Sequence, residues 1–288
     1  MQLDDERESD SVEDRRGGGL VGVGGLGIGV TVIALVVSYF LGIDPSTLLG
    51  VAQNVQRTSP VGGQQHPIDP RSDPEAALVS EVKKVLALTE DTWGALFKQA
   101  GGQYRRPHLV LFRNSTPTAC GTGQAAMGPF YCPADQKVYL DLGFFNEMAR
   151  RFHAGGDFAR AYVIAHEIGH HVQSLTGVTE KTDAMRARMS KTEFNRVSVR
   201  VELQADCFAG VWAHHANRAK PFLDPGDVEE ALTAANAIGD DTLQRQSRGT
   251  VVPDSFTHGT SAQRMRWFKA GFDTGSVKAC NTFAAKAL

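Results

Sequence analysis

The sequence lacks an excess of either charge. Thirty lysine and arginine residues stand against 32 aspartate and glutamate residues, which gives a formal net charge of −2 in 288 residues. Proteins that bind nucleic acid through its phosphates usually carry clustered basic residues, so this balance predicts no nucleic-acid partner. The chain also lacks an internal repeat, and nothing in its composition indicates an oligomeric state.

Charged residues are absent from Gly17 to Ile43, a run of 27 residues. As a helix, the part from Leu20 to Leu41 is long enough to cross a hydrocarbon core of about 30 Å. The run therefore predicts a transmembrane anchor over residues 17–43, although its glycines weaken helix propensity in the first turns. A cleavable signal peptide is the alternative, but its apolar region is usually only about 7–15 residues long.

The segments before and after this run are predicted to lie on opposite sides of a membrane. Residues 1–16 are almost entirely polar, so we expect a disordered tail. Three arginines precede the run and Arg57 is the first basic residue after it, so the positive-inside rule places the tail in the cytoplasm. Residues 44–72 are rich in proline, glycine, serine and glutamine and predict a flexible tether. A domain over residues 73–288 would then lie outside the cytoplasm.

Cysteine is scarce, with four residues in the chain. None forms a C-x-x-C pair, which argues against a thiolate zinc site. An even number in an exported domain predicts two disulfides, out of three possible connectivities. Cys120 with Cys132 would close a glycine-rich loop, which leaves Cys207 with Cys280. The alternative is four buried free thiols.

A helical pattern over residues 161–173 contains the pentapeptide His-Glu-x-x-His. Residues four apart lie on one face of a helix, so His166 and His170 can bind one zinc ion through ring nitrogens. Glu167, on the flank of that face, can reach a water on the metal. Zinc lowers the pKa of a bound water to about 7, and a neighbouring carboxylate can take its proton as it attacks a carbonyl. The pattern predicts hydrolysis of peptide bonds; the alternative is a chance match on a helix.

A catalytic zinc site normally has three protein ligands and an open fourth position. Residues 199–213 predict a second, mostly apolar helix on which Glu202 and Asp206 lie one turn apart. A carboxylate in such a helix is costly unless it is paired or binds a metal. We expect Glu202 to complete the coordination and Asp206 to accept the N–H of a liganding histidine. The alternative is an exposed face on which Arg196 and Arg200 pair with the acids.

The two motifs together resemble the zincin metallopeptidases whose third ligand is glutamate. The longer strings Gly-Pro-Phe-Tyr-Cys-Pro, Val-Tyr-Leu-Asp and Glu-Leu-Gln-Ala-Asp-Cys, with the helix around His166, are similar to the neutral zinc metallopeptidases of bacteria. This resemblance runs over nearly the whole chain. It implies an α+β, zincin-like domain, Zn²⁺ as cofactor and a peptide or protein as substrate.

The resemblance also implies further site residues. His258 and Arg264, at the start of a late helix, resemble the oxyanion-binding arrangement of membrane-associated glutamate zincins; a capping histidine and a solvated arginine are the alternatives. Lys137–Leu142 alternates as a strand, and the resemblance implies an edge strand that pairs with an extended substrate. A core strand is the alternative. His171 lies about 100° round the helix from His170, so we expect it to point away from the site.

The remaining pattern fits the α+β class. We expect helices and strands at these positions: Glu75–Phe97, Asp227–Ile238 and Ser261–Phe272 as helices, His108–Arg113 and Lys137–Leu142 as strands. Five other histidines have no partner at ligand spacing and are interpreted as structural or solvated: His66, His108, His153, His214 and His215.

The sequence therefore predicts a membrane-anchored zinc peptidase with Glu167 as its general base. One alternative is a non-catalytic envelope protein that keeps zinc as a structural element, although such a site has no use for Glu167. Another is a zinc amidase that acts on a cell-wall peptide, which shares the same chemistry.

Overall fold

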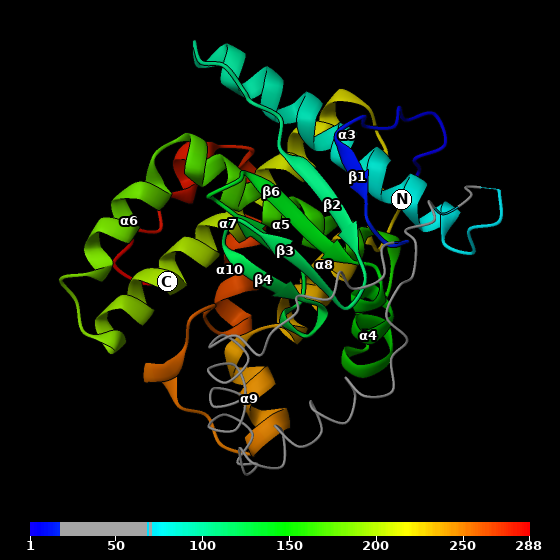
Figure 1. The fold of residues 1–288 in the computed structure, drawn as a ribbon. Coiled ribbons are helices and arrows are strands. Elements are labelled where there is room, and N and C mark those ends of the chain that lie inside the picture. Colours follow the sequence, from blue (N-terminus) through cyan, green and yellow to red (C-terminus); the bar gives the residue numbers. More distant parts are fainter. Residues whose placement is uncertain (18–67, 69–70) are drawn as a thin grey trace, which may run out of the picture. The chain divides into compact units, whose positions relative to one another are not determined.

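The chain folds into helices and two small sheets, which agrees with the predicted α+β class (Figure 1). The structure is a computed structural model that describes residues 1–17, 68 and 71–288. The helices are α3 (Ala76–Gln99), α4 (Gly143–Phe152), α5 (Asp157–Leu175), α6 (Val178–Arg186), α7 (Lys191–Ala219), α8 (Asp227–Ala237), α9 (Asp240–Arg248) and α10 (Ser261–Thr274). The strands are β1 (Val12–Asp14), β2 (His108–Phe112), β3 (Ser115–Thr118), β4 (Gly121–Gln124), β5 (Phe130–Cys132) and β6 (Lys137–Asp141). Short 3₁₀ helices are η1 (Ala125–Met127), η2 (Pro253–Ser255) and η3 (Val277–Cys280).

The larger sheet has the strand order β1-β2-β6-β5, and β3 and β4 form a separate hairpin. Strands β1, β2 and β6 are parallel, whereas β5 runs antiparallel to β6 and ends the sheet. The strand predicted over Lys137–Leu142 is therefore paired on both sides, and its prediction as an edge strand is wrong. Its alternation reflects two buried faces, because Tyr139 stacks on Phe130 of β5 while Val138 and Leu140 enter the main core. The edge is β5.

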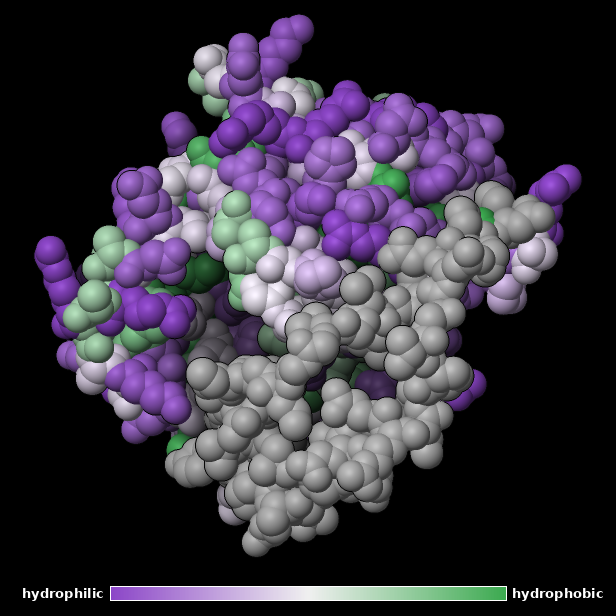
Figure 2. Space-filling model, in the orientation of Figure 1, coloured by the Kyte–Doolittle hydropathy of each residue, from purple (hydrophilic) through white to green (hydrophobic). Residues whose placement is uncertain are grey.

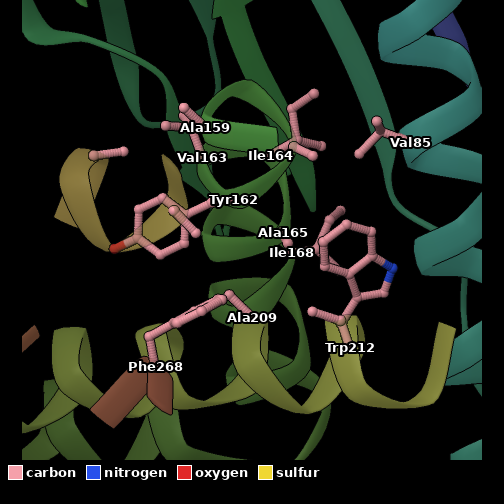
Figure 3. Packing of buried hydrophobic residues seen from close by; sticks show 14 of the residues in the cluster. Val85, Ala159, Tyr162, Val163, Ile164, Ala165, Ile168, Ala209, Trp212 and Phe268 are labelled. Atoms are coloured by element: carbon pink, nitrogen blue, oxygen red, sulfur yellow. The ribbon is translucent and has the colours of Figure 1, made fainter. Parts of the chain in front are cut away.

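Helix α5 lies at the centre of the domain and packs on α3, α7 and α8. Its residues are apolar around most of the helix, which is typical of a helix that is enclosed by other elements. Figure 3 shows Tyr162 and Ile168 of α5 facing Phe268 and Trp212, with the Tyr162 and Phe268 rings at 5.4 Å in edge-to-face contact. Most of the coloured surface in Figure 2 is hydrophilic by comparison. The predicted zinc helix is thus held rigidly by the core.

Helices α7 and α10 approach each other at two glycines. A Cβ atom on Gly210 would lie 2.1 Å from the backbone oxygen of Phe268, and one on Gly271 would lie 2.0 Å from the backbone oxygen of Cys207. Neither position has room for a side chain. The same region carries the disulfide Cys207–Cys280, which joins α7 to η3. Backbone contact and a covalent bond together fix α10 against α7.

The two disulfides predicted from cysteine spacing are confirmed. Cys207 pairs with Cys280 and Cys120 pairs with Cys132, and no cysteine is free. The second bond ties the loop after β3 to the edge strand β5.

The N-terminal segment is ordered, so the prediction of a disordered tail over residues 1–16 is wrong. Figure 1 shows β1, in blue, beside β2, with which it pairs in parallel. Leu3 is 9% exposed and joins the hydrophobic core. The Ser9 hydroxyl donates to the buried carboxylate of Glu90 at 2.7 Å. Several polar residues of this segment are therefore partners of specific groups on the domain, as Ser9 is of Glu90 and Arg7 is of Glu90 and Asp91.

Arg16 ends this segment in a buried ion-pair cluster. Its guanidinium, 2% exposed, lies 2.6 Å from Asp73 and 2.9 Å from Glu75. A buried arginine needs several acidic partners to offset its desolvation. These contacts hold residue 16 directly against the start of the chain that continues into α3.

The predicted membrane topology is also wrong. Residues 1–16 and the chain from residue 71 onward belong to one compact unit, and β1 forms part of its sheet. A single crossing between them would have placed them on opposite sides of a membrane, with the N-terminus in the cytoplasm and the domain outside. The predicted anchor over residues 17–43, apart from Gly17, and most of the tether over residues 44–72 lie outside the described residues. Among the residues that are described, no helix is both long and apolar enough to span a membrane.

The close approach of α7 and α10 gives a stability prediction. Gly210→Ala should destabilise the fold by about 3 kcal/mol or more, because the new methyl group meets backbone atoms that cannot move aside. The matched control is Gly94→Ala in α3, where nothing lies within 4 Å of the new Cβ and the change should be neutral or stabilising by up to about 1 kcal/mol. Urea unfolding measures both. Equal midpoints for the two variants would contradict the tight crossing.

Candidate metal centre

Helix α5 lies between two glycines, Gly156 and Gly177, and carries both motif histidines on one face. Gly156 precedes it with φ of 127° and Gly177 follows it with φ of 76°, values that favour glycine. The rings of His166 and His170 lie 4.8 Å apart between centroids. His166 is buried, and His170 is partly exposed. The spacing of four residues thus brings the two rings together, as predicted.

The donor atoms of His166, His170 and Glu202 all lie within 4.8 Å of one another. Nε2 of His166 is 3.2 Å from Oε2 of Glu202, and Nε2 of His170 is 3.5 Å from the same oxygen. Zinc binds such atoms at about 2.0–2.2 Å, so neighbouring ligands in a tetrahedral site are about 3.3–3.5 Å apart. The three side chains therefore fit one zinc ion, and three ligands leave a fourth position for another molecule.

Opposite charges attract these side chains to one another. Burial alone lowers the pKa of His166, but attraction to Asp206 and hydrogen bonds to Asp206 and Glu202 raise it to about 9. Burial raises the pKa of Glu202, yet the positive charges of His170 and His258 bring it well below its usual range. Protons and a metal ion therefore compete for the same preformed set of nitrogen and oxygen donor atoms.

Asp206 lies behind His166 and is completely buried. Its Oδ1 is 2.8 Å from Nδ1 of His166 and accepts a hydrogen bond of 2.6 Å from the Tyr162 hydroxyl. The carboxylate therefore fixes His166 with Nδ1 protonated and Nε2 directed toward Glu202. This is the arrangement expected for Asp206.

Arg264 compensates the charge of Asp206. It donates from Nε to Oδ2 at 2.9 Å and from Nη2 to Oδ1 at 2.8 Å, and it is 2% exposed. Burial raises the pKa of Asp206, but the charges of Arg264 and His166 outweigh this effect and lower it. The predicted solvated arginine is thus excluded. The guanidinium pairs with Asp206 behind His166 and also lines the cavity that the ligands face, so its predicted contact with a substrate oxyanion stays a prediction.

His170 has a different partner, which the sequence reasoning missed. Its Nδ1 lies 2.9 Å from Oε1 of Gln173, three residues later on the same helix. Gln173 is 1% exposed. The signal was available, because residues i and i+3 share a helix face, but a glutamine at that spacing is common on ordinary helices.

A sequence profile of the family described as "Putative neutral zinc metallopeptidase" matches residues 1–283. The chain belongs to this family. It is 50% identical over 295 residues to the uncharacterized protein YpfJ of Escherichia coli K12, a match that covers 98% of this chain and 99% of that one. It is 43% identical over 210 residues to the uncharacterized protein Rv2575 of Mycobacterium tuberculosis H37Rv, covering 69% and 70% of the two chains. No solved structure gives a significant match.

In this member of the neutral zinc metallopeptidase family, the candidate ligands face a cavity of about 710 Å³. Glu167 lines it, and no hydrogen bond or ion pair occupies its carboxylate among the described residues. His258 also lines the cavity, and its side chain is 48% exposed. The rest of the wall mixes polar and charged side chains with apolar and aromatic ones, of which the larger are these: Met127, Phe130, Tyr131, Phe144, Phe152, Val163 and Phe194.

His258 is oriented by Asp240 at the start of α9. Its Nδ1 lies 3.1 Å from Oδ1 of Asp240, whose other oxygen accepts the backbone N–H of His258 at 2.6 Å. Burial lowers the pKa of His258, but Glu202 and Asp240 raise it above its usual value. With Nδ1 engaged, Nε2 is the nitrogen that can contact a molecule in the cavity.

His171 is fully buried and points away from the ligands, as predicted. One ring nitrogen is 2.6 Å from the backbone oxygen of Arg105 and the other is 3.0 Å from the hydroxyl of Tyr131. Burial lowers the pKa of His171 to about 4, so the ring is neutral and its Nδ1 accepts from Tyr131. It thereby holds the edge strand β5 against α5.

The other histidines lie apart from the ligand cluster where they are described. His214 and His215 bond to the backbone oxygens of Phe272 and Gly275, a structural role as predicted. His66 lies outside the described residues.

The raised pKa of His166 predicts how zinc binding depends on pH. Below about pH 9 the metal-free protein holds a proton on His166, and zinc must displace it. The apparent zinc affinity should therefore fall about tenfold or more per pH unit as the pH is lowered from 8 to 7. Competition with a chelator of known protonation measures it. An affinity that is the same at both values would mean that His166 is already neutral.

Proposed function

We propose that this protein is a zinc-dependent peptidase that hydrolyses bonds in a peptide or protein substrate. The observation that carries the proposal is the combination of three converging ligands with the unpaired carboxylate of Glu167 on the wall of a 710 Å³ cavity. Cavities that bind small organic molecules are typically about 300–1,000 Å³. A peptide segment of a few residues is therefore a suitable occupant.

Each side chain has a distinct task in this reaction. His166, His170 and Glu202 would hold zinc, which would supply polarisation of a substrate carbonyl and a lowered pKa of bound water. Glu167 accepts the proton of the attacking water and returns it to the leaving nitrogen. Nε2 of His258 donates to the oxygen on which negative charge develops. Asp206, with Arg264 behind it, keeps His166 in the required tautomer.

The substrate backbone would pair with β5. This strand ends the sheet, and Phe130 and Tyr131 line the cavity. An edge strand offers unpaired N–H and C=O groups to an extended peptide, while neighbouring pockets receive its side chains. The predicted role of an edge strand is thus transferred from β6 to β5.

A non-catalytic zinc protein is disfavoured by the same geometry. A structural zinc site normally closes its fourth position with a protein ligand, and Glu167 would be a buried acid without a purpose. An amidase that cleaves cell-wall peptides would use the same groups, so substrate choice separates it from a protease.

The central test is Glu167→Gln. This variant should bind one zinc ion per chain with unchanged affinity and lose hydrolysis by about 10²–10⁴-fold, because the amide cannot accept the proton. The matched control is Glu147→Gln, an exposed acid on the wall of the same cavity, which should keep its activity. Unfolded casein and a cell-wall peptide serve as substrates, with new amino termini counted by mass spectrometry. Full activity of Glu167→Gln would refute the mechanism.

His258 and Arg264 should behave differently when they are replaced. His258→Ala should keep zinc and lower kcat by about 10–10³-fold with little change in KM, since it removes a donor used in the transition state. Arg264→Met leaves the buried Asp206 charge without its partner and should destabilise the fold by about 3–5 kcal/mol. Thermal unfolding and steady-state kinetics separate the two effects. A stable, catalytically slow Arg264→Met would restore the oxyanion role to that residue.

A further inference from the structure

Gln173 is a buried polar residue beside the ligands, and its amide is engaged on both sides. Its Oε1 lies 2.9 Å from Nδ1 of His170. Its Nε2 donates to the backbone oxygen of Val201 at 2.7 Å and to Oε1 of Gln204 at 3.1 Å. Both acceptors belong to α7, the helix that supplies Glu202. The side chain thus connects a ligand on one helix to the backbone of the other.

A second amide extends the connection. Gln204, 7% exposed, donates from Nε2 to the backbone oxygen of Cys280 at 3.0 Å. Cys280 is held in place by its disulfide to Cys207. A chain of two glutamine amides therefore runs from His170 to a backbone carbonyl that is fixed covalently to α7.

The backbone carbonyls of Val201 and Cys280 determine the orientation of both glutamine amides. A carbonyl oxygen can only accept, so the NH₂ group of Gln204 must face Cys280 and its Oε1 must face Gln173. The NH₂ group of Gln173 must likewise face Val201, which leaves its Oε1 toward His170. An oxygen at that place requires a proton on Nδ1 of His170. The lone pair of Nε2 is then free on the side of Glu202.

We propose that Gln173 is a positioning residue that sets the metal-binding tautomer of His170, and that Gln204 relays this orientation from the carbonyl of Cys280. The proposal rests on the zinc site of the proposed function. It also gives the two histidines unlike supports, because His166 faces an anion that Arg264 neutralises while His170 faces a neutral amide. Orientation of the ligand is thereby achieved without adding net charge behind the metal.

Zinc binding tests the inference without reference to activity. Gln173→Met keeps the length of the side chain but neither donates nor accepts, and it should weaken zinc binding by about 10–100-fold. Gln204→Met should weaken it less, because Val201 still orients Gln173. The double variant should bind zinc no more weakly than Gln173→Met, because both changes interrupt the same series of hydrogen bonds. Chelator competition with zinc alone, at one fixed pH, measures all three.

The matched control is Asn195→Leu. Asn195 is also a buried amide on α7 that donates to a backbone oxygen, that of Asp254, but it contacts no ligand. Its replacement should leave zinc affinity unchanged even if it lowers the melting temperature. The same affinity in wild type and Gln173→Met would overturn the inference and leave the zinc site intact. A wild type that binds no zinc would instead refute the proposed function.

A second measurement is independent of stability. Nitrogen-15 NMR of the zinc-loaded wild type should show the His170 ring with its proton on Nδ1, as the orientation of the two glutamines requires. A proton on Nε2 of His170 would overturn the proposal even if Gln173→Met binds zinc poorly.

Discussion

The fold depends on one buried charge. Asp206 is fully enclosed, and an unpaired carboxylate at such a place would cost several kcal/mol. Its partners come from α5 and α10, so those helices must meet α7 at this point. The glycines that let α10 touch α7 and the disulfide beside them hold the same helices together. A single carboxylate thus orders the arrangement of three helices and orients a ligand.

The sequence predicted the parts of the site that short-range periodicity controls. Residues four apart on a helix must share a face, which placed His166 with His170 and Glu202 near Asp206. Spacing does not show where a side chain points once its helix is packed, so the buried ion pair of Arg264 with Asp206 was not predicted. Gln173 escaped notice because its importance arises from carbonyl groups of α7, which periodicity within α5 does not reveal.

The fold could be predicted where a segment has a clear helical or apolar strand pattern of its own. It could not be predicted where a strand pairs with residues far away in the sequence. Strand β1 consists of Val-Glu-Asp and has no apolar pattern, yet it pairs with residues almost a hundred positions later. The position of β6 within the sheet likewise depends on which strands join it and not on its own sequence. The disulfide pairing was correct although the membrane topology offered in its support was not.

Arg16 has one more consequence. Its side chain contacts Asp73 and Glu75. The end of the N-terminal segment and the start of the chain that leads into α3 are therefore neighbours in space. In evolutionary terms this is an insertion point: sequence between these residues can lengthen, shorten or diverge without altering the distance that must be closed. A tether of a few residues would be enough to join the two parts of the domain.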